Sequence, residues 1–247
     1  AAVSYTATLD YNAPYNVTSP TIDGYTADKL VVSGNMPASN VIDTVVYRND
    51  VHTLTIHYVY ADNTTAHADY VSEYEFSEAY SVVSPNITGY TPNTATVSGT
   101  MGTEDVTMTV TYTINSYQVN IHYVADGTTA PEDYSQTYNY GVEYSVASPA
   151  VTGYTPDIAT VNGTMGTEAV NVTVTYTVNQ YNLTINYLYT DNTTAYATHT
   201  EQVNYNASYS VTSPTIEGYV ASQDVVSGIM PAHDVTETVT YGTDVYT

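Results

Sequence analysis

Six histidines and 25 acidic residues are the side chains of this 247-residue sequence that could carry acid–base or metal chemistry. His57 and His122 occupy the same place in two copies of a repeated strand pattern, but the next copy has Asn186 there. No histidine has the spacing to a cysteine or carboxylate that a zinc site needs, and no Asp-x-Asp-x-Asp-Gly calcium loop occurs. We interpret both histidines as solvated or cross-strand residues on the polar face of a strand. An enzyme needs an acid, a base and a nucleophile that converge, so we expect no catalytic residue, no metal site and no cofactor.

Acidic residues recur at turns. Asp62-Asn63, Asp126-Gly127 and Asp191-Asn192 each follow an alternating strand. Asp, Asn and Gly tolerate positive φ, so these pairs predict tight hairpin turns. A weak calcium ligand at each aspartate is the alternative interpretation.

Asparagines in Asn-x-Ser/Thr sequences are candidate N-glycosylation sites. They are Asn16, Asn63, Asn86, Asn162, Asn171, Asn182, Asn192 and Asn206. Because a threonine-rich chain produces several such sequences by chance, the pattern is only weak support for glycosylation.

The charge of the chain excludes two classes of partner. The net charge is −23, and the only lysine and arginine are Lys29 and Arg48. Nucleic acids and anionic membranes are bound through clusters of such cations, so we expect neither as a partner. No apolar run approaches the roughly 18 residues of a membrane-spanning helix, which predicts no membrane insertion.

The composition favours a place outside the cell. The chain has no cysteine, which excludes a disulfide scaffold and a thiol catalyst. Charged residues make up only 11% of it, and 29 residues are tyrosine. A polar surface of Thr, Ser, Asn and Tyr is typical of extracellular β-rich stalks. We therefore expect a cell-surface protein, secreted or wall-attached, whose anchor is not in this chain.

One motif occurs four times and organises the sequence: Ser-Pro-x-(Ile/Val)-x-Gly-Tyr, followed seven residues later by Val-x-Gly-x-Met. Its Gly-Tyr pairs are spaced 65, 64 and 65 residues apart, which indicates one structural unit repeated in tandem. The pairs are Gly24-Tyr25, Gly89-Tyr90, Gly153-Tyr154 and Gly218-Tyr219. The repeats are repeat 1 (residues 1–49), repeat 2 (50–114), repeat 3 (115–178) and repeat 4 (179–243), with a stub of a following repeat at 244–247.

The sequence pattern of each repeat predicts β-strands. Leu54, Ile56 and Tyr58 alternate with polar residues, which predicts a half-buried opening strand. The closing strand alternates in the same way, with Val106, Met108, Val110 and Tyr112 on one face of repeat 2. The nearest helix candidate, residues 72–79, is short and rich in Tyr and Glu. We therefore predict all-β units, β-grasp-like or small β-sandwiches, with little or no helix.

The motif has an expected role for each residue type. Proline ends a strand and the glycine allows a sharp bend. We expect the tyrosine after the glycine to pack inward with its hydroxyl bonded to the backbone. An exposed ring that binds a sugar or a partner protein is the alternative. The methionine is expected to fill a gap in the core.

Consecutive repeats are joined almost without a linker. The closing strand ends near Tyr176, and the next opening strand begins near Tyr181. Apolar positions change from even to odd numbers between them, which turns the buried face over. Such short connections limit bending, so we expect the four repeats to form an elongated rod.

The two ends are offset from the repeat. Repeat 1 has no counterpart of the opening strand, and residues 244–247 match residues 50–53, which precede such a strand. Two explanations remain open. The sequence is a window from a longer array, or repeat 1 takes a strand from another molecule in a head-to-tail polymer.

These features together resemble the MucBP (mucin-binding protein) repeat of Gram-positive surface adhesins. The shared elements are the opening strand at Leu54 to Tyr58, the Asp-Asn or Asp-Gly turn, the central Gly89-Tyr90 and the closing Val172 to Tyr176. The resemblance covers the whole chain and implies an elongated surface protein of small β units, often an adhesin for mucus glycans. This chain is richer in tyrosine and much poorer in lysine than the family.

Two hypotheses for function follow. The first is a non-enzymatic adhesin stalk or spacer outside the cell, with weak multivalent binding of host or cell-surface glycans. The alternative is a subunit of a self-assembling surface filament or sheath, in which copies join by β-strand addition at edge strands.

Overall fold

A computed structural model describes residues 4–244, and these fold into two compact units. Unit 1 is residues 1–115 and holds repeats 1 and 2, and unit 2 is residues 116–247 and holds repeats 3 and 4. Residues 244–247 were predicted to be a stub of a following repeat, and 245–247 lie outside the described residues. No helix occurs among the described residues, as the alternating patterns predict, so none there is long and apolar enough to cross a membrane.

The strands of both units follow the alternating segments of the sequence. In unit 1 they are β1 (Pro14–Thr18), β2 (Tyr25–Ala27), β3 (Val31–Asn35), β4 (Tyr47–Asn49), β5 (Val51–Tyr60), β6 (Thr65–Glu75), β7 (Ala79–Val83), β8 (Tyr90–Pro92), β9 (Thr96–Thr100) and β10 (Val106–Ile114). In unit 2 they are β11 (Ser116–Ala125), β12 (Tyr134–Asn139), β13 (Glu143–Ala147), β14 (Tyr154–Pro156), β15 (Thr160–Thr164), β16 (Val170–Val178), β17 (Gln180–Tyr189), β18 (Thr194–Asn204), β19 (Ser208–Thr212), β20 (Tyr219–Ala221), β21 (Val225–Ile229) and β22 (Val235–Thr243).

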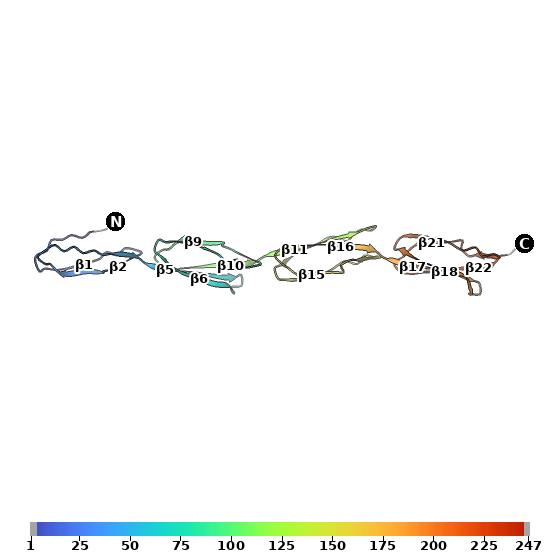
Figure 1. Ribbon diagram of the computed structural model, residues 1–247, viewed down its shortest axis with the longest axis horizontal. Helices are drawn as coiled ribbons and strands as arrows, with labels where there is room; N and C mark the ends of the chain where they lie inside the picture. Colours follow the sequence, from blue (N-terminus) through green and yellow to red (C-terminus); the bar gives the residue numbers. More distant parts are fainter. Residues whose placement is uncertain (1–3, 245–247) are drawn as a thin grey trace. The chain divides into compact units, whose positions relative to one another are not determined.

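Repeat 2 shows the complete unit. The opening strand β5 lies in the middle of a four-stranded sheet of order β6-β5-β10-β8. It pairs antiparallel with β6 and parallel with the closing strand β10. A second sheet, the antiparallel pair β7 and β9, lies on the other side of the repeat (Figure 1). Repeats 3 and 4 have the same arrangement, so β11 and β17 are also central strands.

The core of each complete repeat lies between these two sheets. In repeat 2 it contains the apolar face of the opening strand, the end of the closing strand and the valine and methionine of the motif, which confirms the core role expected for methionine. The buried residues are Leu54, Ile56, Tyr58, Val97, Met101, Val110 and Tyr112. Met108 was expected on the same face as these residues, but it is 43% exposed, whereas Val106 at the start of β10 is partly buried against the core.

The predicted tight turns are present in repeats 2 and 4, but in repeat 3 a longer loop of residues 126–133 connects β11 to β12. Asn63, Gly127 and Asn192 have φ of 65°, 78° and 66°. Asp62 accepts hydrogen bonds from the backbone N–H and the hydroxyl of Thr64, and these bonds lower the pKa of its carboxyl. Asp191 accepts the same two bonds from Thr193, so Asp62 and Asp191 have a local structural role. The former helix candidate at residues 72–79 is the end of β6 followed by a turn and the start of β7.

The second glycine of the motif lies beneath a tyrosine of the facing strand. Tyr80 on β7 is paired directly with Gly99 on β9, and a Cβ added to Gly99 would lie 2.5 Å from the Tyr80 hydroxyl oxygen. The same pairs are Tyr15 with Gly34, Tyr144 with Gly163 and Tyr209 with Gly228. An aromatic ring covers the backbone where the glycine has no side chain to pack.

Repeat 1 differs from the other three. β1 pairs with β3 and β2 with β4, but residues 41–46 form no strand, because the opening strand that would pair with them is missing. None of the apolar side chains in residues 4–49 is buried, and Ile42 is 93% exposed. Repeat 1 therefore folds locally without a closed core.

Candidate functional site

The tyrosine of the Gly-Tyr pair does not take the position expected for it. Its ring is half-buried in all four repeats, and in repeats 2 and 4 it packs on a tyrosine at the end of the opening strand, where repeat 3 has Ala125. Ring centroids are 4.7 Å apart for Tyr90 with Tyr60 and for Tyr219 with Tyr189.

The hydroxyl-to-backbone bond expected there is made by the tyrosine of the closing strand. In repeat 2, Tyr112 is fully buried and donates to the carbonyl of Pro85 at 2.6 Å. The same bond joins Tyr176 to Pro149 and Tyr241 to Pro214. Both tyrosines carry an apolar ring and a hydroxyl, and only the packing distinguishes their positions.

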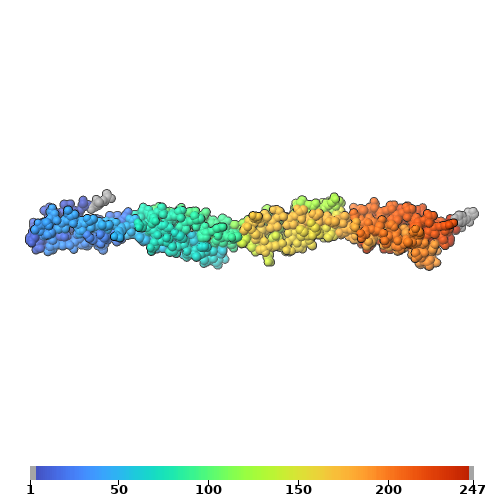
Figure 2. Space-filling model, in the orientation of Figure 1, coloured from blue at the N-terminus to red at the C-terminus, as the bar shows by residue number. Residues whose placement is uncertain are grey.

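The Gly-Tyr pair forms one half of the junction between repeats 1 and 2. The ring of Phe76 from repeat 2 lies against Gly24, where an added Cβ would be 2.4 Å from the ring. Phe76 also meets the edge of Tyr25, with centroids 5.6 Å apart and planes at 72°. Gly24 has φ of 78°, so glycine is required there both by the backbone and by the ring. Figure 2 shows the surfaces of repeat 1 (blue) and repeat 2 (cyan and green) in contact.

A single residue, Asp50, connects β4 to β5 and is hydrogen-bonded to both repeats. Its N–H donates to Gly24 at 2.9 Å, its carbonyl accepts from the Phe76 N–H at 2.7 Å, and its carboxylate accepts from the Thr26 hydroxyl at 2.6 Å. We call this arrangement of Gly24, Tyr25, Asp50 and Phe76 the junction clamp. With one residue held on three sides, the connection has little freedom to bend.

Unit 2 contains the same clamp between repeats 3 and 4. Tyr205 lies against Gly153, where an added Cβ would be 2.1 Å from its ring, and its centroid is 6.2 Å from that of Tyr154. Asn179 takes the place of Asp50, with bonds of 2.8 Å to Gly153 and from the Tyr205 N–H. At Gly218 no atom lies within 4 Å of an added Cβ.

Sequence reasoning missed the aromatic half of this clamp, although a signal for it exists. An aromatic residue occurs four positions before the tyrosine that covers the second glycine in every repeat. These residues are Tyr11, Phe76, Tyr140 and Tyr205.

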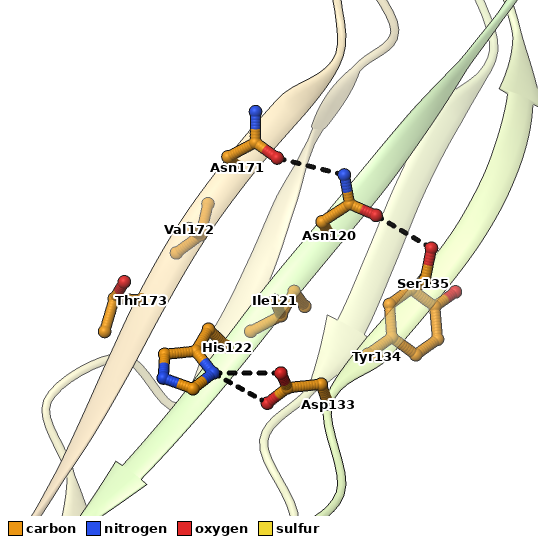
Figure 3. A pocket seen from close by; sticks show the side chains of 9 residues that line it. All are labelled: Asn120, Ile121, His122, Asp133, Tyr134, Ser135, Asn171, Val172 and Thr173. Atoms are coloured by element: carbon orange, nitrogen blue, oxygen red, sulfur yellow. Dashed lines mark hydrogen bonds and ion pairs between the residues drawn. The ribbon is translucent and has the colours of Figure 1, made fainter.

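The polar face of repeat 3 carries a hollow of about 300 Å³ (Figure 3). Asn120 on β11 donates to Asn171 on β16 at 2.9 Å and accepts from the Ser135 hydroxyl on β12 at 2.7 Å. Beside them, His122 Nδ1 lies 2.9 Å from Asp133 Oδ2. The hollow is open and offers amide, hydroxyl, imidazole and carboxylate groups, but no nucleophile with a base.

Asp133 holds a charge at this site. The hydrogen bond with His122 and a second from the Tyr123 N–H lower the pKa of the Asp133 carboxyl. In repeat 2, His57 pairs with Asp69 at 2.8 Å, and in repeat 4 Asn186 accepts from Thr198 at 3.2 Å. The histidines are therefore cross-strand residues of the polar face, as predicted. The described residues contain no cluster of three or more metal-ligating side chains.

The asparagines of the Asn-x-Ser/Thr sequences all lie on the surface. Three of them, Asn63, Asn192 and Asn206, have positive φ in turns. Asn171 is bonded to Asn120 in the hollow, and Asn182 donates to Asp234. Lys29, one of the two cations, pairs with Asp43 in repeat 1, and their hydrogen bond raises the pKa of Lys29 and lowers that of Asp43.

Comparison with known proteins identifies the family of the repeats and supports the all-β fold. The profile of a family described as the MucBP domain matches residues 1–48, 53–113, 118–177 and 182–244. Internalin J of Listeria monocytogenes serovar 1/2a is 28% identical over 191 residues, which are 72% of this chain and 21% of that protein. The chain spans about a fifth of the length of the internalin J relatives that it matches.

Two solved structures are also similar. The match to the Bacillus anthracis TIE protein covers 85% of this chain and 54% of the TIE protein chain, with a TM-score of 0.51 and 12% sequence identity. This is a similarity of fold alone. A MucBP domain from a Lactobacillus acidophilus protein is 27% identical, covers 27% of this chain and 92% of its own, and has a TM-score of 0.22.

Proposed function

This chain belongs to the MucBP family, and we propose that it serves as the stalk or spacer of an extracellular, cell-surface adhesin, without enzymatic activity. The observation that carries the proposal is the junction clamp. A spacer must resist bending between its units, and a single connecting residue bonded to both neighbours provides that resistance. The similarity to internalin J and the polar, tyrosine-rich surface support a place outside the cell.

Distance measurements between repeats test the spacer role. The chain has no cysteine, so Ser33→Cys and Ser98→Cys place spin labels at equivalent exposed positions of repeats 1 and 2 without side reactions. We expect a narrow distance distribution in the parent chain and a broad one after Phe76→Ala, which removes the ring from Gly24. Tyr11→Ala is the control, because this ring has the same place in repeat 1 but is 77% exposed. A distribution already broad in the parent chain would contradict the spacer function.

Weak, multivalent glycan binding is the finer part of the proposal. The hollow of repeat 3 supports it, since paired amides and a carboxylate on a flat polar face are groups that hydrogen-bond sugar hydroxyls. We expect the chain to be retained on immobilised mucin, and the double variant Asn120→Ala/Asn171→Ala to be retained less. Thr55→Ala/Thr107→Ala changes the corresponding pair of repeat 2 and serves as the control. If the parent chain bound neither mucin nor a glycan array, the glycan-binding part of the proposal would be wrong and only the spacer role would remain.

Exposed apolar side chains among the described residues of repeat 1 favour a second candidate, a filament subunit that receives a strand from another copy. Ile42 at 93% and Leu30 at 74% exposure are apolar side chains that an added strand could cover. Sizing over a range of concentrations separates the two candidates. Oligomers that grow with concentration support the filament, and a monomer at every concentration supports the spacer.

A further inference from the structure

Two pairs of tyrosines lie on the edge strands of repeats 2 and 3 with their hydroxyl groups in contact. On β6, the hydroxyl oxygens of Tyr70 and Tyr74 are 2.9 Å apart. On β12, those of Tyr134 and Tyr138 are 2.7 Å apart. Each pair occupies the same register, opposite an isoleucine and an aromatic or histidine residue of the central strand.

The contact follows from the geometry of a strand. Residues four apart lie on the same face, with Cα atoms separated by about 13 Å at the rise of an extended chain. The two rings must therefore lean toward each other over the residue between them, Ser72 in repeat 2 and Gln136 in repeat 3. Gln136 also accepts a hydrogen bond from Tyr134 at 2.6 Å, which helps to hold the leaning ring.

A third tyrosine completes each group. The ring centroids of Tyr80 and Tyr74 are 5.7 Å apart, and those of Tyr144 and Tyr138 are also 5.7 Å apart. The hydrogen bond within the pair raises the pKa of Tyr74 to about 12, and the same holds for Tyr134. The Tyr74 and Tyr134 phenols are thus neutral at physiological pH, and each has a hydroxyl group of another tyrosine in hydrogen-bond contact.

We propose that Tyr70–Tyr74 and Tyr134–Tyr138 are sites of oxidative coupling, at which each pair becomes an o,o′-dityrosine cross-link. The oxidant is hydrogen peroxide used by a haem peroxidase, both supplied from outside the chain. Each phenol loses one electron and one proton to become a phenoxyl radical. A carbon–carbon bond then forms between the two ortho carbons, and the two ring hydrogens move to the oxygens. Each pair loses two hydrogen atoms in total, and one peroxide is reduced to two waters.

The arrangement favours coupling within a pair over other reactions. In an o,o′-dityrosine the two hydroxyls are neighbours, and here they are already in contact before any bond forms. The product would covalently cross-link two residues that are four positions apart on an edge strand. Edge strands are the strands most accessible to pairing with another chain. Repeat 4 offers an internal comparison, because His199 and Val203 stand at the two positions in the same register.

Peroxidase treatment of the full chain tests the proposal. The dilute chain is exposed to hydrogen peroxide and a haem peroxidase, quenched with catalase, digested with pepsin and examined by mass spectrometry and dityrosine fluorescence. We expect peptides of β6 and β12 to lose two hydrogen atoms, while the β18 peptide, which contains the 53% exposed Tyr196, does not. Tyr74→Phe should abolish the product in repeat 2 and leave it in repeat 3, and Tyr138→Phe should do the reverse.

Three results would overturn the proposal. The first is a β6 or β12 peptide that stays unmodified while exposed tyrosines are consumed. The second is product that appears only as covalent dimers whose yield rises with chain concentration. The third is a product in repeat 2 that survives Tyr74→Phe, since the bond would then join other residues.

Discussion

Repeats 1 and 2 lie in the same unit and carry the same motif, yet only repeat 2 has a closed core. Both place a tyrosine over the second glycine, and both bond a closing-strand tyrosine to the proline carbonyl, Tyr47 to Pro20 in repeat 1 and Tyr112 to Pro85 in repeat 2. Tyr112 is fully buried, whereas Tyr47 is half-buried. The motif therefore determines local geometry, and the opening strand determines burial.

The reason lies in the position of the opening strand. β5 pairs with both β6 and β10, so it joins these two strands into one sheet and supplies Leu54, Ile56 and Tyr58 to the core. Without such a strand, residues 41–46 of repeat 1 join no sheet among the described residues and make only scattered bonds, such as those between Val46 and Asp28.

Alkaline pH should produce the largest difference in stability between repeat 1 and repeats 2 to 4. The pKa is raised in eight tyrosines, all in repeats 2 to 4: Tyr58, Tyr74, Tyr112, Tyr123, Tyr134, Tyr176, Tyr187 and Tyr241. Burial is the main cause of the raised pKa except at Tyr74 and Tyr134, where the main cause is the hydrogen bond with the hydroxyl of the paired tyrosine.

Because the folded pKa exceeds the unfolded value of about 10, these neutral phenols stabilise the fold fully below that pH and lose the effect as pH rises further. We expect cooperative unfolding of repeats 2 to 4 between about pH 10 and 12, seen by circular dichroism and tyrosinate absorbance together. Tyrosinate that forms without loss of β signal would contradict this.

Leu54→Ala should have the next largest effect. Leu54 is fully buried in the central strand, and removing three carbons there should lower the free energy of unfolding of repeat 2 by about 2–5 kcal/mol. Hydrogen exchange of the β5 and β10 amides measures this loss by repeat. Leu9→Ala, at a 39% exposed site of repeat 1, is the control and should change stability by about 0.5 kcal/mol or less.

Gly24→Ala and Gly218→Ala measure what the junction clamp adds. Both glycines have φ near 77°, so both variants should lose about 1–2 kcal/mol from the backbone alone. Only Gly24 faces an aromatic ring, and overpacking against Phe76 should add about 1–3 kcal/mol. Urea unfolding of each variant gives the comparison, and equal losses would mean that the ring moves aside freely.

Tyr112→Phe should have the smallest of these effects. It removes the bond to Pro85 and leaves a half-buried carbonyl unpaired, which should lower the free energy of unfolding by about 0.5–1.5 kcal/mol. Tyr47→Phe removes the corresponding bond in repeat 1, where water reaches the carbonyl, and should cost less. Equal losses in thermal unfolding would show that burial does not distinguish the two bonds.

Much of the fold was predictable because its signals are local. The alternation at residues 54–58 predicted β5, and Asp62-Asn63 predicted the turn to β6. The His57 and His122 positions on the polar face followed from the same two-residue period. Alternation also put Met108 on the face of Val110, but it does not say how much of that face is covered, and Met108 is 43% exposed.

The candidate sites were less predictable because their partners are distant in sequence. The glycine of the Gly-Tyr pair was identified, but Phe76, which lies against Gly24, is 52 residues away along the chain. The hollow at Asn120 combines three strands, and no spacing in the sequence shows that Asn171 and Ser135 meet it.

The sequence by itself determined the four repeats, the all-β class, the turns and the face of each strand, because these depend on neighbours one to a few residues apart. Only the tertiary structure decided which tyrosine is buried and which aromatic ring closes a junction. Those outcomes depend on pairing between strands about 50 residues apart, as in β5 with β10, and a strand's own residues do not specify whether such a partner is present.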